Sequence, residues 1–308
     1  MLKALLISLS ESRWLRTLAE RSSLGQHISG RFVAGTQVED ALRVTQTLNH
    51  AGLSVSIDNL GENVSTADEA RHSAQLYCQL LSEISARGLN ANISVKLTHM
   101  GLDVDPRLAY DNVCALIQQA AASQPKNFVR VDMEGSAYTQ RTLDLVRELH
   151  RAPENRGCVG TVIQSYMRRA EADIAQLLRE GIRIRLCKGA YKEPAGIAYQ
   201  AKSEVDSNYI RLMKVLLKSG IYHGLATHDE SIIREAQSFA TREKIFPEAF
   251  EFQMLYGIRR DLEQSLVREG WRMRVYVPFG AGWYPYLMRR LAERPANVLF
   301  VAKNLLRK

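Results

Sequence analysis

The chain has 308 residues, of which 46% are hydrophobic and 24% are charged, and this composition is typical of a globular protein and excludes a disordered or collagen-like one. A chain of this length buries roughly three quarters of its unfolded surface without disulfides or structural metal, and no apolar run reaches the roughly 20 residues of a membrane span. The net charge of +8 favours an anionic partner, but basic residues mixed with carboxylates disfavour a nucleic-acid module.

The first 45 residues are predicted to form a helical segment. Residues 1–8 are apolar, but Glu11, Arg13 and Arg16 follow at once and no small-residue cleavage site is evident. We therefore interpret the start as an amphipathic helix and not as a signal peptide. Cysteines without a CxxC pair or a metal-ligand spacing disfavour a zinc site and fit a cytoplasmic protein; they are Cys78, Cys114, Cys158 and Cys187.

From residue 53 onward, a short β-branched run, a turn and a longer helical segment follow one another repeatedly. Helical stretches such as 66–88, 139–152 and 168–181 place apolar residues at i, i+3, i+4 and i+7. Between the helices lie runs that predict strands, at 53–59, 92–98, 128–133, 159–164, 183–188, 223–228, 250–255 and 273–278.

Eight strand–helix units without a linker predict one domain over residues 1–308, a (βα)8 TIM-type barrel preceded by the helical segment 1–45. The spacing implies parallel strands joined by right-handed crossovers. A doubly wound sheet is the alternative, but its GxGxxG fingerprint is missing, as are a P-loop and an HExxH motif.

Polar residues gather toward the carboxyl ends of the predicted strands, the face at which barrel enzymes carry their sites. We expect apolar strand interiors and few charged residues at strand starts. Any one of these polar residues taken alone is also compatible with a solvated rim or a structural ion pair, and His228 with a satisfied core histidine. They are Lys96, Asp132, Glu134, Gln164, Arg185, Lys188, Thr227, His228, Gln253 and Tyr276.

The segment YLMRRLAE (286–293) predicts a helix after the last strand. Tyr286, Arg289, Arg290 and Glu293 share one broad face of it. Two adjacent guanidiniums turned toward the barrel mouth would bind a carboxylate or phosphate, with Glu293 holding one of them. A solvated basic helix face is the alternative.

The run RLCKGAYKEP (185–194) offers the backbone amides of Gly189 and Ala190 beside Lys188, an arrangement suited to an anionic group or a flavin edge. The sequence offers neither a Ser-His-Asp set nor a metal cage, and we expect no close pair of unpaired carboxylates. A cationic site that is poor in acid–base groups suits redox chemistry performed by a cofactor.

Together these segments resemble the bacterial proline dehydrogenase family, the FAD-dependent first enzymes of proline catabolism. The order and spacing agree across roughly residues 30 to 303, and the length resembles that of the monofunctional members. The segments are FVAG (32–35), IDNLGE (57–62), SVKLT (94–98), VDMEG (131–135), RLCKGAY (185–191), ATH (226–228), FEFQMLYG (250–257), YVPFG (276–280) and YLMRRLAE (286–293).

The resemblance implies a distorted (βα)8 barrel that holds FAD over the carboxyl ends of the strands. L-Proline would pass a hydride from C5 to flavin N5, giving Δ1-pyrroline-5-carboxylate. A membrane quinone would take the electrons during transient peripheral contact at the inner face of the cell membrane. A separate pyrroline-5-carboxylate dehydrogenase would receive the product.

The resemblance also assigns roles to single residues. Asp132 and Arg185 are expected to be catalytic, and Glu62 and Glu293 to support the site. The substrate contacts are expected to be Lys96, Tyr276, Tyr286, Arg289 and Arg290. The flavin contacts are expected to be Met133, Gln164, Arg185, Lys188, Gly189, Ala190, Thr227, His228 and Gln253, with no metal.

Asp229 departs from the family pattern, in which Asn commonly follows ATH. Two other functions stay open. One is a barrel enzyme that acts on a small carboxylate or phosphate substrate without flavin. The other is an inactive barrel that binds an acidic partner or a membrane through its basic surface.

Overall fold

The computed structural model describes Trp14 and residues 29–61 and 63–293, with residues 289–293 in their backbone only. Most of the predicted helical segment 1–45, including the amphipathic helix expected at residues 1–8, lies outside the described residues. Within that segment, the structure shows the start of helix α4 (Val38–His50). None of the described helices is both long enough and apolar enough to cross a bilayer.

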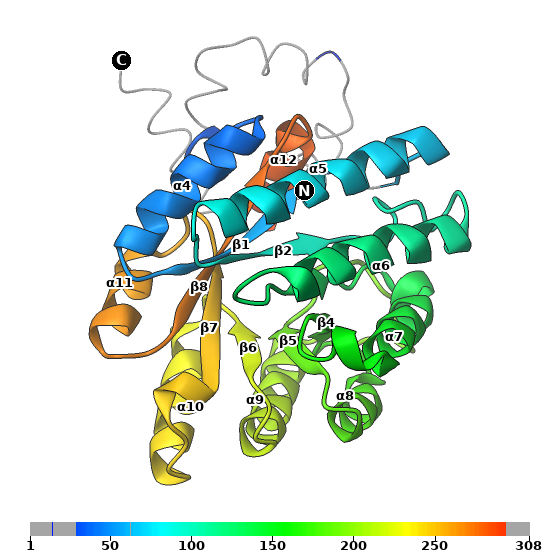
Figure 1. The fold of residues 1–308 in the computed structure, drawn as a ribbon. Coiled ribbons are helices and arrows are strands. Elements are labelled where there is room, and N and C mark those ends of the chain that lie inside the picture. The colour runs from blue at the N-terminus through cyan, green and yellow to red at the C-terminus, as the bar shows by residue number, and fades with distance from the viewer. Residues whose placement is uncertain (1–13, 15–28, 62, 294–308) are drawn as a thin grey trace.

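Eight parallel strands form a closed barrel in chain order, with helices around it (Figure 1). The ring closes where β1 pairs with β8, from Ser54 opposite Arg274 to Asn59 opposite Phe279, so the predicted barrel is confirmed and the doubly wound alternative is excluded. The strands are β1 (Ser54–Asn59), β2 (Ala91–Val95), β3 (Val129–Val131), β4 (Val159–Gln164), β5 (Arg183–Cys187), β6 (His223–Ala226), β7 (Phe250–Leu255) and β8 (Met273–Phe279).

Some of the helices between the strands begin at residues whose side chains accept hydrogen bonds from the free backbone amides. Thr66 and Glu69 form a capping box at the start of α5, and Asp105 caps α6 ahead of Pro106. The helices are α5 (Ala67–Ala86), α6 (Pro106–Ala122), α7 (Ser136–Arg151), α8 (Ala170–Arg179), α9 (Lys202–Lys218), α10 (Glu230–Arg242), α11 (Arg260–Arg268) and α12 (Trp283–Glu293), with 3-10 turns η1 (Pro153–Asn155) and η2 (Pro247–Ala249).

The two ends of the chain depart from a regular barrel. Helix α4 precedes the first strand and packs against β1 and β8. Helix α12 follows β8, and its Trp283, Tyr284, Tyr286 and Leu287 form a buried cluster with Phe32 and Val33, separate from the main core. Figure 1 shows α4 and α12 at the same end of the molecule. The predicted helix at 286–293 is therefore confirmed as the C-terminal part of α12.

The strands have one apolar face and one polar face. Residues that point toward the helices, such as Val55, Ile57 and Ile184, are fully buried in the main hydrophobic core. The alternate residues point into the barrel, and many of these are polar: Ser56, Ser94, Arg130, Arg185, Glu251, Gln253 and Arg274 are all buried.

The expectation of apolar strand interiors with few charges at strand starts is therefore wrong for the inward face. Arg130, Glu251 and Arg274 are each the second residue of their strand, and all three are buried. Because side chains alternate along a strand, apolar packing against helices requires only every second residue. The other residues line the barrel axis, where Arg274 pairs with Glu251 and Arg130 donates to the carbonyl oxygens of Thr161 and Arg183.

Candidate active site

A cavity of about 780 Å³ opens at the carboxyl ends of the strands. Its walls come from strands β4 to β8 and from the loops that follow β2, β3, β5, β6 and β7. Twelve predicted site residues line it, so sequence positions far apart in the chain meet there: Lys96, Asp132, Met133, Gln164, Arg185, Lys188, Gly189, Ala190, Thr227, His228, Gln253 and Tyr276.

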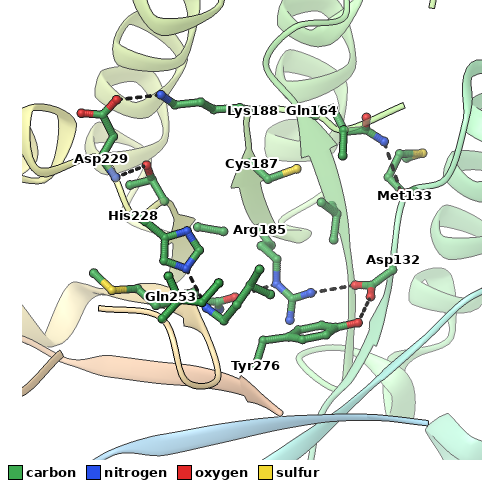
Figure 2. A pocket seen from close by; sticks show the side chains of 18 of the residues that line it. Asp132, Met133, Gln164, Arg185, Cys187, Lys188, His228, Asp229, Gln253 and Tyr276 are labelled. Atoms are coloured by element: carbon green, nitrogen blue, oxygen red, sulfur yellow. Dashed lines mark hydrogen bonds and ion pairs between the residues drawn. The ribbon is translucent and has the colours of Figure 1, made fainter. Parts of the chain in front are cut away.

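Arg185 is held in the barrel by hydrogen bonds from all three of its guanidinium nitrogens. Nε donates to Gln253 Oε1 at 2.6 Å, and Nη1 donates to Asp132 Oδ1 at 2.7 Å. Nη2 donates to Ser56 Oγ at 3.1 Å and Ser94 Oγ at 3.0 Å. Figure 2 shows Arg185 between Gln253 and Asp132. The guanidinium plane is thereby fixed at the cavity wall.

Asp132 joins Arg185 to Tyr276. Its Oδ2 accepts a hydrogen bond of 2.9 Å from the Tyr276 hydroxyl, and the Arg185 guanidinium carbon lies 5.1 Å from the centre of the Tyr276 ring. Burial, and then the nearby Asp132 carboxylate, raise the pKa of Tyr276 well above its ordinary value. The phenol therefore stays protonated and acts as a donor.

Lys96 directly follows the last residue of β2 and forms an ion pair with Asp58 on β1. Its Nζ lies 3.1 Å from both carboxylate oxygens, and Tyr77 also donates to Oδ1 at 3.3 Å. Burial raises the pKa of Asp58, and Lys96 opposes that rise. The pair keeps a cation at the cavity on the side of β2.

Lys188 lies where β5 ends and the KGAY segment begins. Its Nζ lies 2.8 Å from Asp229 Oδ2 and 2.5 Å from Asp206 Oδ1. Burial raises the pKa of Asp229, but the hydrogen bonds from Lys188 and Ser231 outweigh it and hold this pKa below its ordinary value. Gly189 has φ +109°, and a β-carbon there would overlap the Tyr166 ring, so this turn requires glycine.

Gln164 and His228 are oriented by backbone groups. Gln164 Nε2 donates to the carbonyl oxygens of Met133 at 3.2 Å and Glu134 at 2.9 Å. Its Oε1 is buried and has no hydrogen-bond partner among the described residues. His228 Nε2 accepts from the Leu255 amide at 3.0 Å, so this nitrogen is unprotonated. His228 is thus both satisfied and part of the cavity wall.

The remaining predicted residues either do not line the described cavity or fall outside the described residues. Tyr286, an expected substrate contact, is buried in the cluster with Phe32 and Val33, and it is not among the residues that line the described cavity. Glu134 accepts from the amide and hydroxyl of Thr98 at 3.1 and 2.7 Å, which ties the β2 and β3 loops together. Glu62 and the side chains of Arg289, Arg290 and Glu293 lie outside the described residues.

The cavity also contains residues that the sequence analysis did not select. Tyr191 ends the KGAY segment, and Cys187 ends β5 two positions after Arg185. Burial raises the pKa of Cys187 to about 12, so its thiol stays protonated. Alternation along β5 would have indicated Cys187, since residues i and i+2 face the same side of a strand.

A closed barrel with a polar, cation-rich cavity at the carboxyl ends of its strands is the architecture of (βα)8-barrel enzymes. Comparison with known proteins shows which family of barrel enzymes the chain belongs to. The family profile described as proline dehydrogenase matches residues 41–303, and the chain belongs to the proline dehydrogenase family.

Curated relatives and solved structures agree with that assignment. Proline dehydrogenase 2 of Bacillus subtilis (strain 168) is 39% identical over 300 residues, which are 97% of each chain. Proline dehydrogenase of Deinococcus radiodurans is 39% identical and covers 94% of this chain and 96% of its own. Proline utilization A from Bdellovibrio bacteriovorus, inactivated by N-propargylglycine, superposes with a TM-score of 0.81 at 26% identity. That match covers 87% of this chain and 33% of the larger protein.

Proposed function

We propose that this proline dehydrogenase is FAD-dependent and oxidises L-proline to Δ1-pyrroline-5-carboxylate, with a quinone as the electron acceptor. The observation that carries the proposal is the position of the Arg185 guanidinium. Hydrogen bonds donated by all three of its nitrogens fix it at the wall of the barrel cavity. A fixed positive charge of this kind stabilises negative charge that develops on a bound cofactor.

The cavity residues fit a flavin. Gln164 Oε1 is buried without a partner among the described residues and is suited to accept a hydrogen bond from a ring N–H. Lys188 and the turn at Gly189 and Ala190 also line the site and are suited to bind an anionic group. These residues would hold the flavin, and its chemistry when bound would be to provide the acceptor for the hydride from C5 of proline.

Binding of the substrate carboxylate is assigned to Arg289, Arg290 and Lys96. Lys96 lines the cavity, and its ion pair with Asp58 keeps it in place at 3.1 Å. Each charge-assisted hydrogen bond to the carboxylate would contribute roughly 1.5–3 kcal/mol. Tyr276, held by Asp132, would pack against the substrate ring, and its orientation would be fixed before substrate binds.

The substrate amine must be neutral for hydride loss from C5. We therefore expect kcat/KM for L-proline to rise with pH into the alkaline range. A pH profile of kcat/KM between pH 6 and 9 checks this, and a flat profile would count against hydride loss from the neutral amine.

Quinone reduction requires transient contact with a membrane. We propose that one proline dehydrogenase unit spans residues 1–308 and works in the cytoplasm, touching the inner face of the cell membrane to pass on electrons. A separate pyrroline-5-carboxylate dehydrogenase would then oxidise the product. The net charge of +8 is compatible with an anionic lipid surface.

Anaerobic titration with L-proline tests the proposed function. The purified protein is expected to carry the visible absorbance of an oxidised flavin, to lose it on addition of L-proline, and to regain it with a soluble quinone. A colourless protein that does not take up FAD would favour the flavin-free barrel enzyme. A yellow protein that L-proline does not bleach would favour the inactive, binding-only barrel.

A further inference from the structure

A second buried polar layer lies beneath the cavity, at the starts of β7 and β8. Its centre is Glu251, which is 3% exposed. Glu251 Oε1 accepts from Arg274 Nε at 2.7 Å and from Gln253 Nε2 at 2.6 Å, and Oε2 accepts from the Tyr222 hydroxyl at 2.8 Å. Arg274 Nη1 is fixed in turn by the Val55 carbonyl at 2.6 Å. The layer is therefore anchored to the backbone of β1.

Glu251 is ionised within this layer. Burial alone would raise its pKa, but Arg274 and the hydrogen bonds from Tyr222 and Gln253 outweigh burial and hold the pKa below its ordinary value. An ionised carboxylate can only accept hydrogen bonds. The group that Gln253 turns toward Glu251 must therefore be its NH₂ group.

This contact determines the orientation of the whole Gln253 amide. With Nε2 toward Glu251, Oε1 faces Arg185 and accepts from its Nε at 2.6 Å. The reversed amide would place its oxygen against the carboxylate and its NH₂ against the Arg185 Nε–H, so both contacts would become repulsive. Gly224 on β6 leaves room for this side chain, because a β-carbon there would overlap the Gln253 amide.

We propose that Glu251 is a positioning residue for Arg185 and acts through Gln253. The carboxylate sets the amide, and the amide sets the rotation of the guanidinium that faces the cavity. The effect on turnover rests on the proposed function, whereas the effect on the Arg185 Nε–H hydrogen bond does not.

Three variants separate positioning from simple stabilisation. In Glu251→Gln, the new Oε1 can still accept from Gln253 and Arg274, and its NH₂ can donate to the Tyr222 oxygen. Orientation is kept, but the Arg274 charge loses its counter-ion and stability falls. The double variant Glu251→Met with Arg274→Met replaces the ion pair by apolar side chains, which largely preserves stability but removes the acceptor for Gln253. The third variant, Gln253→Met, removes the amide itself.

Phe252→Leu serves as the matched control. Phe252 lies between the two positions on β7, is 1% exposed and packs against Trp271 in the outer core. The substitution perturbs the same strand from its opposite face and leaves the hydrogen bonds of Gln253 in place.

The first measurement follows the ¹⁵N-labelled Arg185 Nε–H in the full chain, assigned by its loss in Arg185→Lys. We expect this proton to exchange with solvent about tenfold faster in the double variant and in Gln253→Met, and at the parent rate in Glu251→Gln and Phe252→Leu. The second measurement is the anaerobic rate of flavin reduction by L-proline, expected to fall roughly 10–100-fold in the double variant and in Gln253→Met. Tm is recorded for every variant.

Suppose that the flavin reduction rate and the Arg185 Nε–H exchange rate both follow Tm, so that Glu251→Gln reduces flavin more slowly and exchanges faster than the double variant. Glu251 is then structural only, and the proposal is overturned. Unchanged exchange in the double variant or in Gln253→Met would also overturn it. If Glu251→Gln does not fold, these two variants still decide the question. A protein without flavin would contradict the proposed function, yet the exchange measurement would still test the positioning role.

Discussion

The outward and inward faces of the barrel strands carry different chemistry. Ile57, on the outward face of β1, is fully buried among apolar side chains, whereas its neighbour Ser56 faces inward and accepts from Arg185. Adjacent residues of one strand therefore serve separate layers. From this difference we expect substitutions on the outward face to change stability and substitutions on the inward face to change catalysis.

The largest expected effect lies on the outward face. Ile57→Ala removes a fully buried side chain from the core, and we expect it to lower the free energy of unfolding by about 2–5 kcal/mol. The kinetic constants of the folded enzyme should stay unchanged. Denaturant unfolding measures the loss of stability, and steady-state kinetics with proline below the Tm measure the kinetic constants. Ser56→Ala is the inward control, expected to change stability by less than about 1.5 kcal/mol. A changed KM in Ile57→Ala would contradict the expectation that the outward face affects stability alone.

Glu263 on α11 sharpens the comparison, because it is a buried carboxylate of the outer helix layer. It is 3% exposed, and its Oε1 has no hydrogen-bond partner among the described residues. Burial raises the pKa of Glu263 from 4.5 to about 7. Because the folded state binds this proton more tightly than the unfolded state, the free energy of unfolding falls as pH rises from 4.5 through 7.

Glu263→Gln should therefore stabilise the protein at pH 8, by at most about 3 kcal/mol, and have little effect near pH 4.5. Urea unfolding at the two pH values measures the difference. Equal effects at both values would show that protonation of Glu263 is not linked to folding.

On the inward face, Asp132→Asn weakens the acceptor that orients both Arg185 and Tyr276. We expect proline turnover to fall about 100-fold, with flavin retained and Tm lowered, because the buried Arg185 guanidinium loses its counter-ion. Asp103→Asn is the control, since Asp103 accepts from Tyr138 at the exposed surface. Steady-state kinetics and the flavin spectrum of both variants decide this, and a full-rate Asp132→Asn enzyme would contradict the assigned role.

A smaller effect is expected from the two arginines of α12. Under the proposed function, Arg289→Lys and Arg290→Lys would each lose bidentate recognition of the substrate carboxylate, so we expect KM for proline to rise about 10-fold or more. Flavin should remain bound. Loss of flavin from both variants would mean that these arginines act on the cofactor and not on proline.

The barrel itself could be predicted from sequence because its signals are local. All eight strands lie at the predicted positions, with ends that differ by up to three residues, as at β2, which ends at Val95. Turn residues and β-branched runs determine such elements over a few positions. The clustering of the polar residues could be predicted from the barrel fold, because the parallel strands of a barrel all end at one face.

The partners inside the barrel could not be predicted in the same way. Arg185 contacts Ser56 and Ser94, 129 and 91 positions away, and no local pattern encodes such pairings. Glu251, Arg130 and Arg274 were not predicted, because they lie near strand starts, whereas charges were expected only at strand ends. Alternation along each strand would have indicated them, since Glu251 and Gln253 face the same side.

The packing of Tyr286 could not be predicted from sequence, and its role as a substrate contact stays a prediction. The helix that carries it was predicted from periodicity, but its packing against Phe32 and Val33 depends on a segment more than 250 positions away. Which face of α12 is buried is a tertiary property, determined by its packing against Phe32 and Val33.

The most direct test of the account is a crystal structure of the protein with its flavin and a proline analogue that competes with L-proline. The account predicts the flavin ring in the barrel cavity against Arg185 and Gln164, with the carboxylate of the analogue between Arg289, Arg290 and Lys96. A flavin bound outside the barrel mouth, or guanidiniums of α12 that face bulk water, would contradict it.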